Sequence, residues 1–142
     1  MRTPDKEPEG NDLGHPPGDG PFLLFTYGTL KSDQCRGGVL AGQEKIGQAR
    51  TTKSLVLLTG GAYPCLVRPQ EGDEPQHVRG ELYNCDRQLL KWLDRIEGSP
   101  FLFKLERIEL EGVEEAVYAY IFQDRKRGRD GLRLVHGEEW TA

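Results

Sequence analysis

The run from Phe22 to Leu30 constrains the fold more than any other stretch of the chain. It begins with the apolar, β-favouring residues Phe22 to Phe25 and stops abruptly at Tyr27-Gly28-Thr29-Leu30. Residues of this kind bury readily as a strand, and Gly28 then allows the backbone to turn where a side chain would collide. Successive free N–H groups at such a strand end can cradle a carboxylate or an oxyanion. The tetrapeptide therefore predicts either a simple turn or a small anion site.

The length and composition of the chain favour one domain. It has 142 residues, of which 36% are apolar, enough for a single modest core. Residues 1–20 contain almost nothing to bury, so we expect a disordered tail followed by a single domain over 21–142. The net charge of −4 argues against a nucleic-acid partner, because phosphate binding needs a concentrated positive face. No apolar run approaches the roughly 18 residues that a membrane helix needs, so no membrane partner is expected.

The thiols and imidazoles form no recognisable metal pattern. They are scattered through the chain, at Cys35, Cys65, Cys85, His15, His77 and His136. An odd number of cysteines without a C-x-x-C pair predicts reduced thiols, as in a cytoplasmic protein. Because the spacings match no known ligand motif, we expect no metal.

The clearest helix is expected from about Asp86 to Ile96. Apolar residues recur there at three- and four-residue spacing, at Leu89, Trp92, Leu93 and Ile96, with Leu90 widening the stripe. Asp86, or Asn84 just before it, can cap the start of the helix. Gly98 followed by Pro100 is the expected stop, with Gly98 in the left-handed conformation.

Glu97 lies in the last turn of this helix, at the margin of the apolar stripe. The negative end of the helix dipole disfavours a carboxylate there and pushes its pKa upward, and burial would add to the shift. Glu97 is therefore either a base at the edge of a pocket or an ordinary surface glutamate. The other acids that cluster in sequence are expected to be solvated charges: Glu106, Glu109, Glu111, Glu114 and Glu115.

The remaining regular segments are β-type. They are 45–52, 54–58, 65–67, 77–84, 103–110 and 115–122, the last two joined as a hairpin. With about six strands, one clear helix and no strand–helix alternation, we expect a mostly antiparallel α+β fold. Closure of the strands into a small barrel would protect the sheet edges.

Several motifs, taken in order, resemble the γ-glutamylcyclotransferase-like (AIG2-like) family, which includes γ-glutamylamine cyclotransferases. Phe25-Thr26-Tyr27-Gly28-Thr29-Leu30 resembles its first strand and Tyr-Gly-Thr/Ser-Leu loop, and Gly61-Ala62-Tyr63-Pro64 its Gly-x-Tyr-Pro segment. Val78-Arg79-Gly80-Glu81-Leu82-Tyr83 is similar to its V-x-G-x-L-Y strand. Leu93-Asp94-Arg95-Ile96-Glu97-Gly98 is similar to its L-D-x-x-E-G, whose glutamate is the catalytic acid/base.

This resemblance implies a small mixed β-barrel with flanking helices, no cofactor and a small-molecule γ-glutamyl substrate. In the family's reaction the free α-amine attacks its own γ-amide carbonyl, releasing an amine or amino acid and closing 5-oxoproline. Glu97 would then be the general acid/base. The residues expected to bind substrate are Tyr27, Gly28, Thr29, Leu30, Tyr63 and Tyr120, although a strand tyrosine such as Tyr120 can equally belong to the core.

Three positions depart from the family pattern, and one of them is Ser99, where an aromatic residue commonly follows Glu-Gly. Phe103 and Lys104 stand where the family often has Tyr and Arg, which leaves open a non-catalytic relative that binds a metabolite or a protein in the same pocket. An unrelated cyclising or amide-transfer enzyme is a third possibility. The leaving group and the oligomeric state also stay open.

Overall fold

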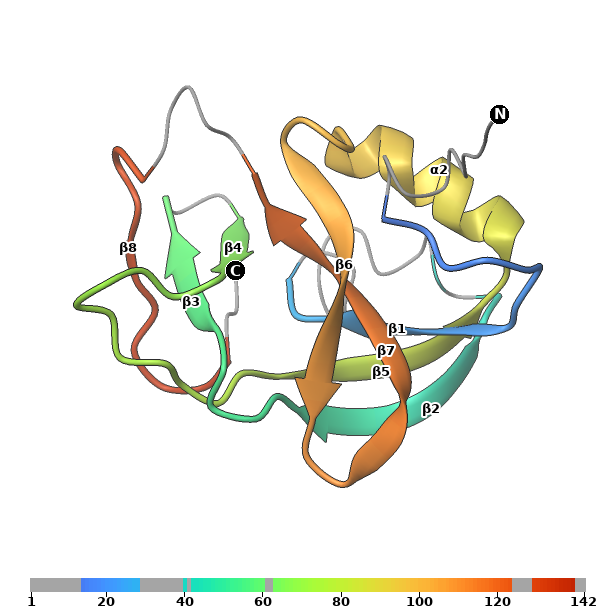
Figure 1. Cartoon of the computed structure of the whole chain (residues 1–142), viewed down its shortest axis with the longest axis horizontal. Coiled ribbons are helices and arrows are strands. Elements are labelled where there is room, and N and C mark those ends of the chain that lie inside the picture. Colours follow the sequence, from blue (N-terminus) through green and yellow to red (C-terminus); the bar gives the residue numbers. More distant parts are fainter. Residues whose placement is uncertain (1–13, 29–39, 41, 61–62, 124–128, 140–142) are drawn as a thin grey trace, which may run out of the picture.

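The computed structural model describes residues 14–28, 40, 42–60, 63–123 and 129–139. The regular elements are β1 (Phe22–Thr26), β2 (Glu44–Arg50), β3 (Val56–Thr59), β4 (Pro64–Val67), β5 (Arg79–Cys85), α2 (Arg87–Glu97), β6 (Phe103–Leu110), β7 (Val113–Phe122) and β8 (Arg133–Leu134). They form a five-stranded sheet in the order β2-β5-β1-β7-β6 and a three-stranded sheet in the order β4-β3-β8 (Figure 1). Neighbouring strands are antiparallel except for β1 and β7. The mostly antiparallel α+β expectation is confirmed.

Strand β1 is the centre of the large sheet, between β5 and β7. Phe22 and Leu24 belong to a buried cluster that includes residues of α2, and Phe25 and Tyr27 belong to a second buried cluster. A strand buried on both faces reads in sequence as a continuous apolar run rather than an alternating one. The run from Phe22 therefore forms a central strand with only Leu23 incompletely buried, and the residues after Thr26 emerge from the middle of the sheet.

The large sheet is curved but not closed into a barrel. Its edge strands β2 and β6 meet at one end, where Thr51 forms an isolated antiparallel bridge with Leu110. Beside the bridge, the N–H of Thr52 donates to the carbonyl of Glu109 at 3.2 Å. The chain then leaves the large sheet to form β3 of the small sheet. The expectation of a barrel holds for the curvature of the sheet and not for its closure.

Helix α2 matches the expected helix closely. The side chain of Asp86 accepts a hydrogen bond from the N–H of Leu89 at 2.8 Å, and Gly98 has φ 66°, so both predicted ends are confirmed. Trp92 was expected in the buried stripe, but it is 53% exposed. The helix is rotated so that Leu90 and Leu93, rather than Trp92, face the core.

The chain before β1 is partly described, although residues 1–20 were expected to form a tail. Residues 1–13 lie outside the described part of the chain, whereas residues 14–20 are placed and His15 is buried. At least one residue of the expected tail, His15, therefore packs against the rest of the described chain. No helix within the described ranges is long and apolar enough to cross a membrane.

Candidate active site

Gly28 packs tightly against Pro64 at the start of β4. A Cβ atom on Gly28 would lie 2.6 Å from Cγ and 2.9 Å from Cδ of Pro64, closer than carbon atoms approach in proteins. The φ of Gly28 is not among the positive values found at other glycines. The sequence predicts that a side chain at position 28 would collide with its surroundings, and the structure identifies the neighbour as the ring of Pro64. Thr29 and Leu30, the other half of the predicted cradle, lie outside the described residues.

The side chain of Tyr27 joins three strands. Its hydroxyl donates to the carbonyl oxygen of Tyr120 on β7 at 2.5 Å and accepts from the N–H of Leu66 on β4 at 3.4 Å. Burial raises the pKa of Tyr27 well above its usual value, and the nearby charge of Glu97 adds to the shift. Tyr27 is therefore a neutral, fully bonded residue beneath the turn that it begins.

Tyr120 points from β7 to helix α2. Its hydroxyl donates to Oδ1 of Asp94 at 2.8 Å, and the carbonyl oxygen of Leu90 lies 3.2 Å away. Burial is the largest cause of the raised pKa of Tyr120, followed by the charge of Asp94, the hydrogen bond to it and the charge of Glu97. Tyr120 is thus a neutral phenol whose hydroxyl is bonded to Asp94 and is also influenced by the charge of Glu97.

Glu97 is the last residue of α2 and is half-buried. Its charge acts on the hydroxyls of both Tyr27 and Tyr120, and such interactions weaken with distance. The carboxylate at the end of α2 is therefore linked electrostatically to Tyr27, which precedes Gly28, and to Tyr120 on β7. A half-buried carboxylate in such surroundings can accept a proton and return it.

Tyr63 lies at the margin of this region. It is half-buried and meets the ring of Phe103 edge-on, with the ring centroids 6.1 Å apart. Phe103, which departs from the family pattern, in turn packs edge-on against Phe122 at 5.5 Å. Phe103 therefore belongs to an aromatic cluster beside Tyr63. The replacement of the family's tyrosine by phenylalanine at this position changes side-chain packing and does not alter the carboxylate of Glu97.

Asp94 was overlooked as a site residue in the sequence. It is only 8% exposed, and it lies three residues before Glu97 on the same helix. A signal was present, because Asp94 follows Leu90 by four residues and so shares the buried face of α2. The side chain of Asp94 contacts His15, whose Nε2 lies 2.8 Å from Oδ2 of Asp94. His15 carried no comparable signal, since it lies among prolines and glycines far from the helix in sequence.

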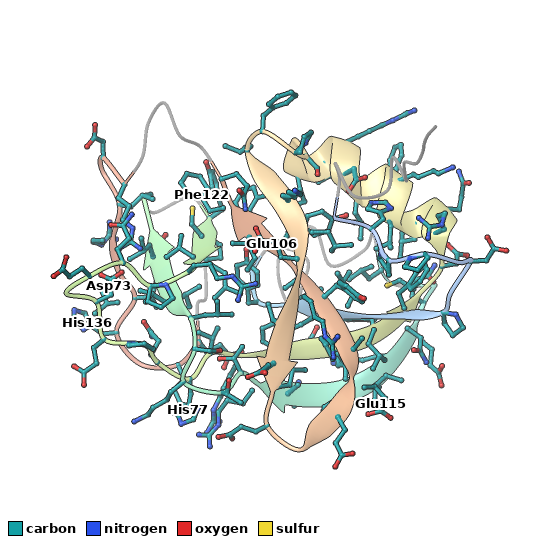
Figure 2. All side chains as sticks on the ribbon, viewed as in Figure 1. Asp73, His77, Glu106, Glu115, Phe122 and His136 are labelled. Carbon is teal, nitrogen blue, oxygen red and sulfur yellow. The ribbon has the colours of Figure 1, made fainter. Side chains whose placement is uncertain are left out.

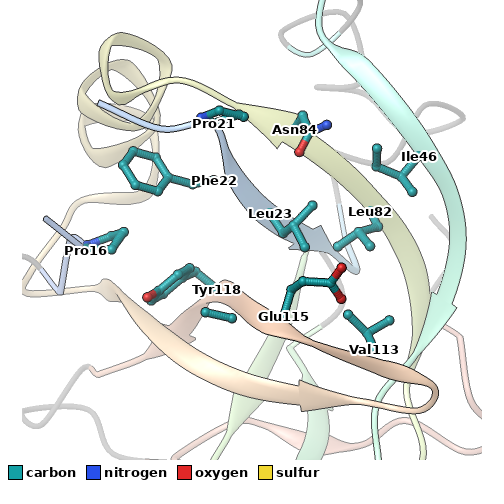
Figure 3. Close-up of a pocket in the computed structure, with 11 residues that line it drawn as sticks. Pro16, Pro21, Phe22, Leu23, Ile46, Leu82, Asn84, Val113, Glu115 and Tyr118 are labelled. Carbon is teal, nitrogen blue, oxygen red and sulfur yellow. The ribbon is translucent and has the colours of Figure 1, made fainter. Parts of the chain in front are cut away.

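The other histidines and a hollow in the described part of the surface lie elsewhere. His77 and His136 are on the side of the small sheet, away from α2 (Figure 2). The hollow, of about 620 Å³, is lined by Leu23, Leu82 and other residues near the start of β1 (Figure 3). Since Gly28 follows the opposite end of this strand, roughly 15 Å away at about 3.3 Å per residue, the hollow is separate from the candidate site. No cluster of three or more metal-binding side chains occurs in the described ranges.

Comparison with known proteins relates most of this chain to one family. Residues 24–142 match the family described as "Gamma-glutamyl cyclotransferase, AIG2-like". A putative gamma-glutamylcyclotransferase of Vibrio cholerae is 34% identical over 83% of this chain and 94% of its own length. A gamma-glutamylaminecyclotransferase of Bos taurus is 31% identical over 84% of this chain and 75% of its own. In fold, the chain resembles the crystal structure of an AIG2-like protein from Mus musculus, with a TM-score of 0.69, 22% identity and coverage of 84% and 88% of the two chains.

Proposed function

This chain belongs to the gamma-glutamyl cyclotransferase, AIG2-like family, and from that premise we propose that Glu97 is the general acid/base of its reaction. The protein is an enzyme of the γ-glutamylcyclotransferase type, with a small γ-glutamyl compound as substrate. The observation that supports the proposal is the charge of Glu97 acting on two buried tyrosines, Tyr27 just before Gly28 and Tyr120 on β7. The relatives are named as cyclotransferases, and nothing in the site favours a non-catalytic binding protein.

The reaction needs one group that can both take and give a proton. The substrate α-ammonium must lose a proton before its nitrogen attacks the γ-carbonyl, and the leaving nitrogen must gain one when the C–N bond breaks. Glu97 performs both transfers in turn. General acid–base catalysis of this kind typically increases the reaction rate by about 10²- to 10⁴-fold. Ring closure to 5-oxoproline is intramolecular, so correct positioning of the substrate supplies much of the remaining acceleration.

The tyrosines contribute through their oxygens rather than their protons. The hydroxyl proton of Tyr120 is committed to Asp94, which leaves lone pairs on the phenol oxygen to accept from the substrate ammonium beside Glu97. Tyr27 has both its donor and an acceptor position occupied, so we assign it to support of the turn. The N–H groups of Gly28, Thr29 and Leu30 hold the substrate carboxylate or the developing oxyanion, and Tyr63 forms part of the pocket wall.

Glu97→Gln tests the central assignment. The variant keeps the shape of the side chain and removes the base, so we expect 5-oxoproline formation to fall by about 10²- to 10⁴-fold. The assay measures 5-oxoproline from a panel of γ-glutamyl dipeptides, γ-glutamyl amines and glutathione, which also identifies the leaving group. Glu114→Gln, at an exposed position on β7, is the matched control and should keep wild-type turnover.

Two results would contradict the proposal in different ways. A folded Glu97→Gln protein with wild-type turnover would remove Glu97 from the chemistry while leaving the activity intact. A wild-type protein that forms no 5-oxoproline from any substrate of the panel would overturn the activity itself.

A cytoplasmic setting is part of the proposal. Cys65 and Cys85 are both buried and form no disulfide in the described structure, and burial raises the pKa of Cys85 to about 12. Reduced thiols fit a reducing compartment.

A further inference from the structure

The segment 14–21 precedes the residues that match the family and is fastened to helix α2. Arg87, the first residue of α2, donates from Nε to the carbonyl oxygen of Gly18 at 2.7 Å and from Nη2 to that of Pro16. Its guanidinium also lies 5.3 Å from the ring centroid of Phe22. The segment therefore has a defined place on the helix that carries the proposed base.

His15 connects this segment to a buried carboxylate. Its Nδ1 lies 3.3 Å from Nη1 of Arg87, and its Nε2 lies 2.8 Å from Oδ2 of Asp94. Since a guanidinium can only donate, Nδ1 must offer its lone pair, and the proton of a neutral ring then sits on Nε2. That proton faces the carboxylate of Asp94.

The contact between His15 and Asp94 is close but poorly aligned. Nε2 is buried and has no hydrogen bond of good geometry, despite its 2.8 Å distance from Oδ2. The two side chains are 3% and 10% exposed, so bulk solvent has little access to them. A buried polar contact of this kind costs stability compared with apolar packing, and its presence calls for another explanation.

Asp94 links His15 to the hydroxyl group of Tyr120. While Oδ2 faces His15, Oδ1 accepts the hydroxyl proton of Tyr120 at 2.8 Å. The charge of Glu97, one turn further along α2, acts on the same hydroxyl. Without Asp94 in place, the hydroxyl of Tyr120 would keep only the carbonyl oxygen of Leu90, 3.2 Å away, as a described acceptor, and its orientation near the site would change.

We propose that His15 is a positioning residue for the cyclotransferase reaction. It holds Asp94 in the orientation that commits the hydroxyl proton of Tyr120 to Oδ1 of Asp94, so that the phenol oxygen accepts from the substrate ammonium. This inference rests on the proposed function. It assigns a role in the site to a residue outside the family-matched part of the chain.

The test compares kcat and KM for 5-oxoproline formation in wild type and His15 variants. We expect His15→Ala to lower kcat by about 10- to 100-fold, since misplacement of groups near the chemistry has effects of this size. His15→Gln should recover most of the loss, because its amide nitrogen can donate to Asp94. Asp19→Asn, exposed in the same segment, is the control and should match wild type.

A second readout separates positioning from stability. A purely structural His15 would lower the free energy of unfolding without lowering kcat of the folded protein. We expect the hydroxyl proton of Tyr120 to exchange slowly in the NMR spectrum of wild type and quickly in His15→Ala. If His15→Ala does not fold, His15→Gln and His15→Asn give the same comparison, because the asparagine amide is too short to reach Asp94.

The outcomes distinguish this inference from the proposed function. An active wild type together with a folded His15→Ala protein of unchanged kcat would overturn the role of His15 alone. An inactive wild type would overturn the proposed function, and the positioning role with it. Reduced kcat in His15→Ala, with recovery in His15→Gln, would support the inference.

Discussion

At the scale of single residues, Gly28 can be tested separately from the chemistry. In Gly28→Ala the new methyl group would lie within 3 Å of two ring atoms of Pro64. Overpacking of this kind costs about 1–3 kcal/mol, so we expect the free energy of unfolding to fall by that amount and turnover to fall as the turn shifts. Denaturant unfolding measures the first effect and the 5-oxoproline assay the second.

Two further variants show whether the Pro64 contact is the cause. Gly42→Ala is a matched control, because a Cβ there meets nothing within 4 Å, and it should leave stability unchanged. Pro64→Ala removes Cγ and Cδ, so the double variant with Gly28→Ala should be less destabilised than the sum of the single variants. Additive effects in the double variant would show that the collision with Pro64 is not what requires glycine.

Site residues could be predicted from the sequence where the residue type and its position in an element are recognisable from the local sequence alone. Gly28 after an apolar strand and Glu97 at a helix end stood out because a glycine turn and a carboxylate at the negative end of a dipole are locally recognisable. Asp94 and His15 did not stand out, since their roles depend on contacts between α2, β7 and the segment before β1. Such pairings are tertiary, and no local spacing encodes them.

At the scale of secondary-structure elements, the N-cap of α2 helps to hold the helix that carries Asp94 and Glu97. Asp86 accepts from the N–H of Leu89 at 2.8 Å, and loss of such a cap costs about 0.5–2 kcal/mol. We therefore expect Asp86→Ala to lower the free energy of unfolding by about 1 kcal/mol. Urea denaturation followed by circular dichroism measures the change.

Asp86→Ser provides the control for the cap, because serine caps helices nearly as well as aspartate. It should keep most of the stability. Equal losses in Asp86→Ser and Asp86→Ala would assign the effect to the charge of the side chain instead of its hydrogen bond.

Elements governed by local rules were predicted well. The helix ends at Asp86 and Gly98 and the span of β6 follow from capping chemistry and residue patterning, and the structure has them as expected. Trp92 was misplaced because several rotations of a helix fit a broad apolar stripe, and only packing against the sheet selects one. The parallel pairing of β1 with β7 also joins segments far apart in sequence, which no local pattern indicates.

At the scale of the whole molecule, the curvature of the large sheet depends on a corner at Thr51. Thr51 is fully buried, and its bridge to Leu110 brings the two edge strands together. Its Oγ1 accepts from the N–H of Val78 at 2.9 Å, while its own N–H donates to the carbonyl of Val78 at 2.9 Å. The expected closed barrel was not found because the chain leaves the large sheet here and enters the small sheet. The apolar pattern of 45–58 does not indicate that its two strands belong to different sheets.

Replacement of Thr51 tests whether this corner is held by its hydrogen bond or by packing. Thr51→Val keeps the shape and leaves the buried N–H of Val78 without an acceptor, which costs about 1–3 kcal/mol. Thr51→Ser keeps the hydroxyl and loses one methyl group, for about 0.5–1.5 kcal/mol. We expect denaturant unfolding to show the larger loss for Thr51→Val, accompanied by faster amide exchange at Val78 and Leu110. A larger loss for Thr51→Ser would mean that packing, and not the hydrogen bond to Val78, holds the two edges of the sheet together.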